Sequence, residues 1–291
     1  MKRIIPLFLV SSLICSFLYI CSSAVAVRTN AKDTFTALLI GFDESPSNTD
    51  VMCIASCDAT RRTLNIIQIP RDTYFDYGDK KGKLNGLYSH ERLRGKTHKD
   101  ALQVLSDKIS EALGIDIDGY VALTTDGLIE TVDFLGGVEI PRQDVPEPLQ
   151  DQFEGDEKNV LLSGKSAYEF VRYRKEYKRG DLERLDAQKT FLKAAFEKIK
   201  SRKDLFSLIK FVQNNKNIYL NFDRGALFLF FVGNRISGDF DFKIQTLSGK
   251  AIKTDSSWYY VVDKEKAQMQ LFEYFPEKLG EFDPNNYFVY K

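Results

Sequence analysis

The feature that most constrains the fold is a succession of three short apolar runs. Each run has the length and the apolar or β-branched content of a β-strand, and Gly41, a polar turn and Pro70 separate or end them. We predict that the second and third runs form an antiparallel hairpin and that the first pairs with the second. The loop after Gly41, the entry at Asp50 and the exit at Pro70 would then meet at one end of the sheet. The three runs are residues 36–40, 51–57 and 63–69.

Helical and strand patterns alternate over the rest of the chain. Alternating helices and strands pack as layers, and the hairpin adds antiparallel pairing, so we predict an α/β fold: a three-layer α-β-α sandwich with a central mixed β-sheet. We expect Asp126 to cap a helix that ends near Gly136, and a polar loop at residues 142–159. Other helices are expected at residues 99–113, 163–173, 182–203, 205–213, 225–234 and 264–275, and other strands at residues 120–123, 138–141, 240–247 and 258–262.

The charge balance limits the classes of ligand. The 291 residues include 41 lysines and arginines and 41 aspartates and glutamates, so the formal net charge is zero. Non-specific nucleic-acid binding depends on a basic excess that displaces counterions from the phosphates. We therefore expect no nucleic-acid partner, and any anionic ligand must be held by a local cluster of cations.

An apolar leader begins the chain. Residues 4–27 carry no charged side chain and follow Lys2 and Arg3. As a helix this run would extend about 36 Å, which is enough to cross a hydrocarbon core of about 30 Å. We predict a signal-anchor or transmembrane segment at residues 1–30 and an exported domain at residues 31–291, because the leading positive charge keeps the N-terminus inside. Cleavage near residues 24–26, or lipidation of Cys21, stays open as an alternative.

Cysteine and histidine offer little chemistry in the exported part. Cys53 and Cys57 lie in one predicted strand, about 13 Å apart, which no disulfide spans. We expect two buried, unreactive thiols. His90 and His98 match no metal-binding motif and are expected to be solvated.

Charged residues gather where the first three strands are predicted to end. Asp43 follows the first strand and Asp50 begins the second. Two carboxylates with open positions beside them are typical of Mg²⁺ sites that also bind substrate phosphates, although aspartates are also common in turns. Arg71 and Asp72 leave the third strand at the same end, and a guanidinium there can hold a phosphate through two hydrogen bonds.

A second charged segment lies at residues 172–188. On a helix, Asp181, Arg184 and Gln188 fall within an arc of roughly 60°. One polar face would then present an anion-binding arginine with two groups able to orient it. A solvated, charged helix face is the alternative. Apolar side chains at 191, 192, 195, 196 and 199 continue the helix and are expected to attach it to the core.

These segments together resemble the LytR-CpsA-Psr family of cell-wall glycopolymer transferases. The resemblance runs from about residue 36 to about residue 200 and continues more weakly beyond. The matching segments are residues 41–43 (Gly-Phe-Asp), 48–52 (Asn-Thr-Asp-Val-Met), 69–73 (Ile-Pro-Arg-Asp-Thr), 83–85 (Lys-Leu-Asn), 135–138 (Leu-Gly-Gly-Val), 164 with 167, 172–174 (Arg-Tyr-Arg), and Asp181, Arg184 and Gln188 before 190–192.

The resemblance implies a pocket for a polyprenyl pyrophosphate. Asp43 and Asp50 would hold Mg²⁺ on the diphosphate. The family usually has an arginine just before the second of these aspartates, whereas residues 47–49 here are Ser-Asn-Thr. The implied catalytic residues are Arg71, Asp72, Arg172, Arg174 and Arg184, and the implied substrate-binding residues are Lys83, Asp181 and Gln188.

The implied activity is transfer of an anionic glycopolymer from its polyprenyl pyrophosphate carrier to peptidoglycan, by an extracellular enzyme held at the cell membrane. The polymer would be a teichoic acid, a capsule or another wall polysaccharide. Two alternatives stay open: a polyprenyl pyrophosphate phosphatase that uses water as acceptor, and a non-catalytic lipid or polymer binder. The lipid would need an apolar slot, for which Phe134, Phe170, Phe191 and Phe196 are candidates.

Overall fold

The fold is given by a computed structural model, which describes residues 34–44, 47–153, 155–173, 181–201, 205–221, 240–255, 257–276, 280 and 288. The predicted leader at residues 1–30, the predicted helix at 225–234 and Arg174 lie outside these residues, as does the side chain of Asp181. Within the described part of the chain, no helix is both long enough and apolar enough to cross a membrane.

The described elements are a mixture of strands and helices, as predicted, although they do not alternate strictly. The strands are β1 (Thr34–Phe42), β2 (Thr49–Asp58), β3 (Thr63–Gln68), β4 (Tyr74–Asp76), β5 (Lys81–Lys83), β6 (Gly119–Leu123), β7 (Val138–Pro141), β8 (Asn159–Leu162), β9 (Ile218–Leu220), β10 (Asp241–Thr246), β11 (Gly249–Lys253) and β12 (Trp258–Val262). The helices are η1 (Leu84–Gly86), α2 (Leu87–Leu93), α3 (His98–Leu113), α4 (Thr125–Phe134), η2 (Arg142–Asp144), α5 (Glu147–Gln150), α6 (Gly164–Arg172), α7 (Asp181–Lys200), α8 (Leu205–Asn214) and α10 (Lys264–Tyr274).

A mixed six-stranded sheet in the order β10-β3-β2-β1-β6-β9 forms the centre of the described structure. β2 is antiparallel to both β1 and β3, as the three apolar runs predicted. β6 joins β1 in parallel, and β10 joins β3 in parallel. The prediction of a central mixed sheet is therefore confirmed, and the ends of β1, β2 and β3 do meet at one edge.

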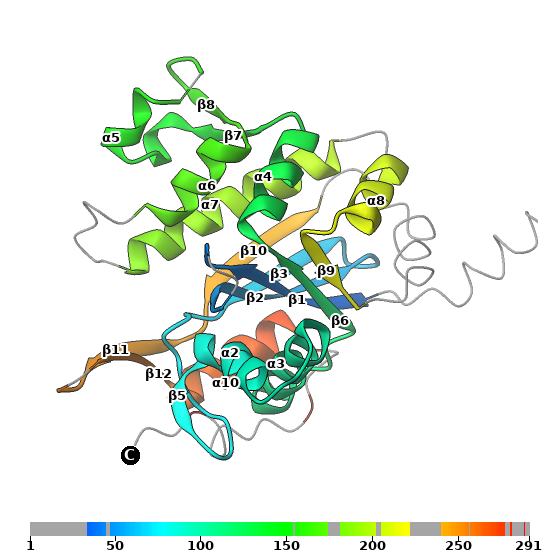
Figure 1. Ribbon diagram of the computed structural model, residues 1–291. Coiled ribbons are helices and arrows are strands. Elements are labelled where there is room, and N and C mark those ends of the chain that lie inside the picture. The colour runs from blue at the N-terminus through cyan, green and yellow to red at the C-terminus, as the bar shows by residue number, and fades with distance from the viewer. Residues whose placement is uncertain are drawn as a thin grey trace, which may run out of the picture.

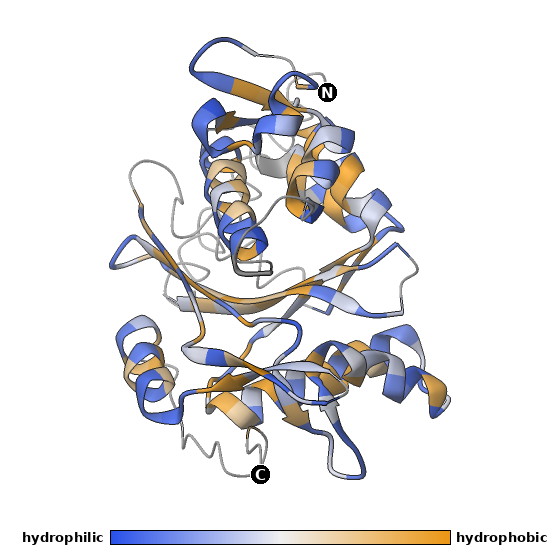
Figure 2. Ribbon diagram, turned by 90° about the vertical axis from the view of Figure 1, so that its left-hand side faces the viewer, coloured by the Kyte–Doolittle hydropathy of each residue, from blue (hydrophilic) through white to orange (hydrophobic). Residues whose placement is uncertain are grey.

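Helices cover both faces of this sheet (Figure 1). We call the face that carries Leu38, Ile40 and Ile54 the packed face. Side chains from α2, α3 and α10 fill the space against it and form the largest buried cluster, with Leu102 and Leu105 fully buried. Figure 2 shows the hydrophobic residues of the helical layers gathered beside the sheet. Burial of this apolar surface is the main force that holds the layers together.

The opposite face, which carries Leu39, Val51 and Cys53, is covered by α4, α6 and α7, and we call it the cavity face. Gly164 begins α6 against the backbone of α4: a Cβ at Gly164 would lie 2.3 Å from the carbonyl oxygen of Ile129. Only glycine allows this close approach. α4 and α6 therefore form one pair that stands over the sheet.

Several local predictions are wrong. Thr124, not Asp126, caps α4, because its side chain accepts a hydrogen bond from Gly127 N–H. The stretch expected as a loop contains η2, α5 and the start of β8, and β11 and the β4–β5 hairpin were not expected. His90 and His98, which were expected to be solvated, lie on α2 and α3 and are partly buried; the His98 ring stacks on Tyr219.

Candidate functional site

Asp50 reaches the site because of a β-bulge. Gly41 pairs with Val51 but the next residue, Phe42, pairs with Thr49, so Asp50 is an extra residue in β2. In a regular strand Asp50 would share the packed face with Met52, since alternate residues point to opposite sides. The bulge instead places Asp50 beside Val51 among the residues that line a cavity on the other face.

Arg71 lies directly after Pro70 and contacts this aspartate. Its Nη1 is 2.5 Å from Asp50 Oδ1 and its Nε is 3.9 Å from Asp72 Oδ1. Lys83, on β5, places its Nζ 3.1 Å from the same Asp72 oxygen. The ion pairs link the exit of β3 to the start of β2 and to β5, so Arg71, Asp72 and Lys83 form one charged group as predicted.

Arg172 ends α6 on the other side of the cavity. Its Nη1 is 2.5 Å from Glu44 Oε1, and its guanidinium lies 4.9 Å from the ring centre of Tyr168. The Tyr168 hydroxyl donates to the same Glu44 oxygen at 2.6 Å. Glu44 lies two residues after the end of β1, so this contact joins the end of the sheet to α6. No sequence pattern pointed to Glu44 or Tyr168.

Arg184 and Gln188 lie one turn apart on α7, and both line the cavity. Arg184 is only 1% exposed and Gln188 only 4%. Gln68 Nε2 donates to Gln188 Oε1 at 2.8 Å, and Gln188 Nε2 donates to the Val171 carbonyl at 3.3 Å. Gln188 thus ties β3 to α6. The alternative of a solvated helix face is wrong, since the polar face is turned inward.

Arg184 has a fixed charge in this buried position. Its guanidinium stays protonated in proteins. A charge in a low-dielectric setting interacts more strongly with an anion than a charge in water does. A phosphate that entered the cavity beside Arg184 would therefore feel a stronger attraction than at an exposed arginine.

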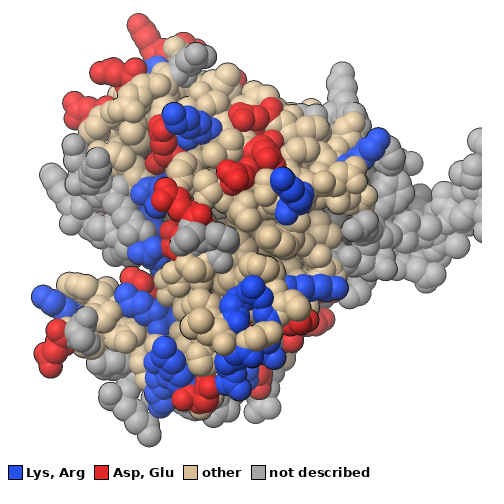
Figure 3. All heavy atoms as spheres, in the orientation of Figure 1, with Lys and Arg blue, Asp and Glu red and all other residues tan. Residues whose placement is uncertain are grey.

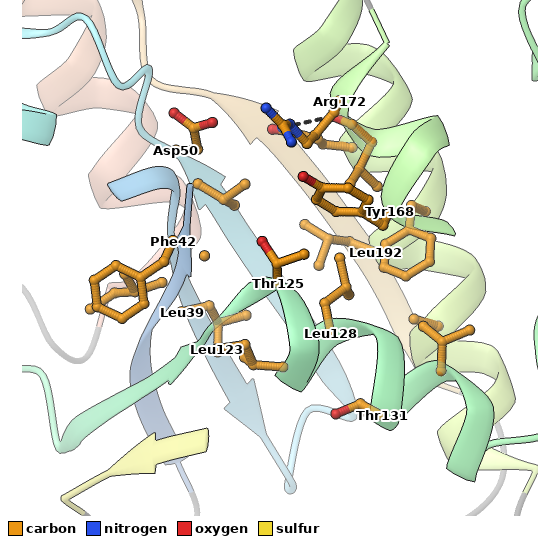
Figure 4. Close-up of a pocket in the computed structure, with 18 of the residues that line it drawn as sticks. Leu39, Phe42, Asp50, Leu123, Thr125, Leu128, Thr131, Tyr168, Arg172 and Leu192 are labelled. Carbon is orange, nitrogen blue, oxygen red and sulfur yellow. Dashed lines mark hydrogen bonds between the residues drawn. The ribbon is translucent and has the colours of Figure 1, made fainter. Parts of the chain in front are cut away.

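The cavity combines a charged end with an apolar interior. Its volume is about 220 Å³. Figure 4 shows Asp50 and Arg172 at one end, with Leu39, Leu128 and Leu192 further in. The apolar lining comes from the sheet and from α4, α6 and α7: Leu39, Val51, Cys53, Leu123, Leu128, Val132, Leu135, Val171, Phe191, Leu192, Ala195 and Ile199.

One of the four phenylalanines predicted for an apolar slot lies in this cavity. Phe191 lines it, whereas Phe134 stacks on Phe211 and Phe196 contacts Phe240 and Phe242. Phe170 is buried in the neighbouring core. Residues 128, 131, 132 and 135, in and just after α4, line the cavity, and their spacing is that of one helix face. The same pattern is also typical of an ordinary core helix, so periodicity could not identify the cavity.

Asp43 lies beside the cavity rather than in its lining. Its carboxylate accepts from Ser47 N–H, Asn48 N–H and Asn48 Nδ2 at 3.2 to 3.4 Å. Asp43 and Asp50 lie near the ends of paired strands and offer only oxygen atoms, and one or two carboxylates together with substrate phosphates are what Mg²⁺ commonly uses. In the described chain no group of three or more His, Cys, Asp or Glu could hold a metal. The donor chemistry fits Mg²⁺ on a phosphate substrate.

The two cysteines are free thiols, as predicted. Burial raises the pKa of Cys53 to about 12, against a smaller opposing effect of Lys189. Burial also raises the pKa of Cys57 to about 12, and the nearby Asp58 adds to this. A nucleophilic cysteine needs a lowered pKa, so neither thiol is suited to that role, although Cys53 lines the cavity.

The described site thus brings together most of the predicted residues. Asp50, Arg172, Arg184 and Gln188 line the cavity. Arg71 pairs with Asp50, and Asp72 lies beside Arg71 and pairs with Lys83. Arg174 and the side chain of Asp181 lie outside the description.

The chain is similar in sequence to known proteins. A model of the LytR_cpsA_psr family matches residues 20–273. A protein of Oceanobacillus iheyensis named polyisoprenyl-teichoic acid–peptidoglycan teichoic acid transferase TagU is 27% identical over 242 residues, which cover 81% of this chain and 73% of that protein. TagU of Bacillus subtilis is 25% identical over 245 residues, which cover 82% and 76% of the two chains.

A solved structure shares the fold. The crystal structure of B. subtilis TagV matches with a TM-score of 0.65 and 22% identity, and the match covers 84% of this chain and 98% of that one. The family model spans most of the 291 residues. The chain belongs to the LytR-CpsA-Psr family.

Proposed function

We propose that the protein transfers an anionic glycopolymer of the teichoic-acid class from a polyprenyl pyrophosphate carrier to peptidoglycan. The names of the relatives in O. iheyensis and B. subtilis support this substrate class. We further propose that the leader at residues 1–30 holds the domain on the outer side of the cell membrane, where both lipid carrier and peptidoglycan are within reach.

The observation that carries the proposal is the two-part cavity. A polyprenyl pyrophosphate has a long apolar tail and two phosphates, and it needs both an apolar slot and cations at one end of that slot. Leu39, Leu128 and Leu192 lie in the interior, and Arg172 and Arg184 are among the polar residues that line it. A water-soluble phosphate ester would gain nothing from the apolar part.

The phosphates would replace carboxylates that now neutralise the arginines. Arg71 pairs with Asp50 and Arg172 pairs with Glu44. A diphosphate between them would accept forked hydrogen bonds from both guanidinium groups. Mg²⁺, held by Asp43 and Asp50, would neutralise further charge on the phosphate oxygens.

The transfer itself would be an in-line displacement at the sugar-proximal phosphorus. The hydroxyl oxygen of the peptidoglycan sugar forms a bond to this phosphorus, and the bond to the bridging oxygen breaks. Polyprenyl phosphate leaves, and Asp72, beside Arg71, takes the hydroxyl proton. Such reactions depend mainly on positioning and charge stabilisation.

The test uses full-length protein in detergent with a polyprenyl-pyrophosphate-linked glycan and peptidoglycan fragments. We expect polyprenyl phosphate release and polymer transfer, both lost on chelation of divalent cations. Arg184→Ala and Arg71→Ala should each lower turnover by about 100-fold or more. Arg61→Ala, an exposed arginine that pairs with Asp58 near the β2–β3 turn, is the matched control and should have no effect.

Two other results would replace the proposal. Release of polyprenyl phosphate that does not depend on peptidoglycan would identify a phosphatase. Tight lipid binding with no release in any acceptor condition would identify a binding protein. Normal transfer by both Arg184→Ala and Arg71→Ala would show that the site lies elsewhere.

A further inference from the structure

The β11–β12 hairpin projects from the body of the molecule beside the end of β3 (Figure 1). Its base is attached to the loop that carries Arg71 and Asp72. Tyr260 N–H donates to the Asp72 carbonyl at 2.9 Å, and Tyr260 forms a parallel bridge with Thr73. The hairpin is therefore a direct neighbour of the candidate site.

The hairpin contacts the site through the middle of β12, and Trp258 lies nearer the tip. Trp258 and Lys253 form the last pair before the hairpin turn. The bridge between Tyr260 and Thr73 is isolated, and Arg71 lies in the turn before it. Two residues of strand, or about 7 Å, separate Tyr260 from Trp258. A ligand held by Trp258 would therefore have to extend along β12 to reach the Arg71 loop.

The hairpin is held at a defined angle. A Cβ at Gly249 would lie 2.6 Å from Cε1 of Tyr260, so glycine is required for the Tyr260 ring to fold against β11. The Tyr260 hydroxyl then donates to the Leu247 carbonyl at 2.6 Å. On the other side of the hairpin, the Tyr259 ring packs against Tyr74 at 5.5 Å. Both faces of the base are therefore anchored.

The outer end of the hairpin presents an aromatic ring beside a cation. Trp258 is 54% exposed, and Lys253, its partner in β11, places its Nζ 5.9 Å from the ring centre. A single exposed ring needs no explanation by itself. Here, however, the indole and the lysine beside it lie on the hairpin that contacts the Asp72 loop, and together they offer a ligand a flat apolar face and a positive charge.

Basic side chains continue from this end toward the body. Lys83, which contacts Asp72, lies 6.0 Å from the Tyr259 ring. In Figure 3, lysines and arginines gather over the lower part of the molecule, whereas acidic side chains are more frequent above. A ligand that runs along the hairpin would therefore meet positive charge.

We propose that the Trp258 end of this hairpin binds the glycan strand that acts as acceptor. The proposal rests on the function proposed above. The flat C–H face of a sugar ring stacks on an indole, which leaves the sugar hydroxyls in water. Lys253 and Lys83 would attract the carboxylates that peptidoglycan carries. A strand held here would lead one of its hydroxyls toward the phosphates at Arg71.

A lipid surface is the competing ligand, because tryptophan and lysine are also common at membrane interfaces. The composition of the turn argues against it. Thr254, Asp255 and Ser257 beside Trp258 are polar, and the exposed Met269 and Phe272 lie on α10 rather than in this turn. A sugar needs one flat ring with polar neighbours, whereas insertion into lipid needs several apolar side chains.

The single tryptophan of the chain makes the binding step directly measurable. Soluble peptidoglycan glycan fragments, added to the full-length protein in detergent without any lipid substrate, should change the tryptophan emission in a saturable way. Anionic phospholipid vesicles and inorganic phosphate should not. Saturable change with vesicles but not with glycan would overturn the proposal in favour of a membrane contact.

Kinetics separate this inference from the proposed function. Trp258→Ala should raise the acceptor KM about tenfold and leave binding of the lipid substrate unchanged. Trp258→Tyr should restore most of the affinity because it keeps a flat ring. Phe272→Ala, which removes another exposed ring, is the matched control and should leave the acceptor KM unchanged.

The two proposals fail in different ways. Normal transfer with an unchanged acceptor KM in Trp258→Ala, and no change in emission with glycan, would refute the docking site and leave the transferase intact. Saturable glycan binding without transfer under any condition would refute the transferase and leave the docking site intact.

Discussion

The two faces of the central sheet differ although they belong to the same strands. On the packed face, Leu38, Ile54, Leu102 and Leu105 are fully buried. On the cavity face, Leu39 and its neighbours line a space of about 220 Å³. Were it enclosed and empty, a space of that size would cost on the order of 5 kcal/mol. One face is therefore closely packed, whereas the other leaves a cavity beside the charged residues.

The largest change in transfer activity should come from filling the cavity. Ala195, on α7, lines it. Ala195→Trp should lower transfer from a long-chain lipid carrier by about 100-fold, or about 2.7 kcal/mol of activation free energy, because the indole occupies the space of the tail. The free energy of unfolding should change by less than about 1 kcal/mol. Transfer assays and urea denaturation would measure both.

The matched variant on the packed face is Ala101→Trp. Ala101 is fully buried in the core on α3, so the indole has no space there. We expect a loss of about 3 kcal/mol or more of unfolding free energy. Equal losses of stability in the two variants would show that the cavity face is packed as tightly as the other.

Truncation of a leucine should give the same contrast in stability between the two faces. Leu102→Ala on the packed face should lower the free energy of unfolding by about 3 kcal/mol, since it leaves a hole in a close-packed core. Leu192→Ala should lower it by about 1 kcal/mol, because Leu192 is half-buried and already borders a cavity. The shift in the denaturant midpoint, at an unchanged slope of the unfolding curve, would measure this difference. Comparable losses of stability in the two variants would contradict the distinction between the faces.

Two threonines should respond in opposite directions. Thr125 lines the cavity, and its buried hydroxyl has no hydrogen-bond partner within the described residues. Thr125→Val should raise the free energy of unfolding by about 0.5 kcal/mol. Thr36, whose hydroxyl bonds to that of Ser56 at 2.9 Å, is fully buried in β1. Thr36→Val should lower it by about 1 kcal/mol. Thermal denaturation would measure both changes. Changes of the same sign in the two variants would contradict the prediction.

The smallest expected effect is on the pH dependence of the free energy of unfolding, through a histidine on the packed side. Burial lowers the pKa of His98 below its ordinary value of 6.5, and Arg92 adds to this. The unfolded chain therefore binds the proton more readily, and stability is present above pH 6.5 and lost as the pH falls below it. In His98→Gln, the free energy of unfolding should decline less between pH 7 and pH 5 than it does in the unsubstituted protein. His90→Gln, the chain's other histidine, is the control, and an equally reduced decline there would contradict this assignment.

Local sequence patterns predicted one part of the site and missed another. The order of β1, β2 and β3 and the placement of Arg71 followed from three apolar runs and a proline. The shared face of Arg184 and Gln188 on α7 followed from their spacing, whereas its burial came only from the structure. The bulge at Asp50 left no trace in periodicity, and Glu44 had no pattern that linked it to Arg172, 128 residues away.

The predicted helix cap was wrong for a related reason. Thr124 and Asp126 are both good capping residues, and the choice between them depends on where β6 ends. Similarly, the β4–β5 and β11–β12 hairpins depend on contacts with the body, such as the bond from Tyr260 N–H to Asp72. Short strands of this kind are stable only when they pack against a larger structure.

The sequence by itself determined the mixed α/β architecture and the collection of charged groups at one end of the sheet, because strand order and turn positions are local properties of the chain. Only the tertiary structure decided that one sheet face would stay open, that Asp50 would turn toward it, and that β12 would pack against the loop of Asp72. These features arise where segments far apart in the chain pack together, and no local spacing encodes the space left between them.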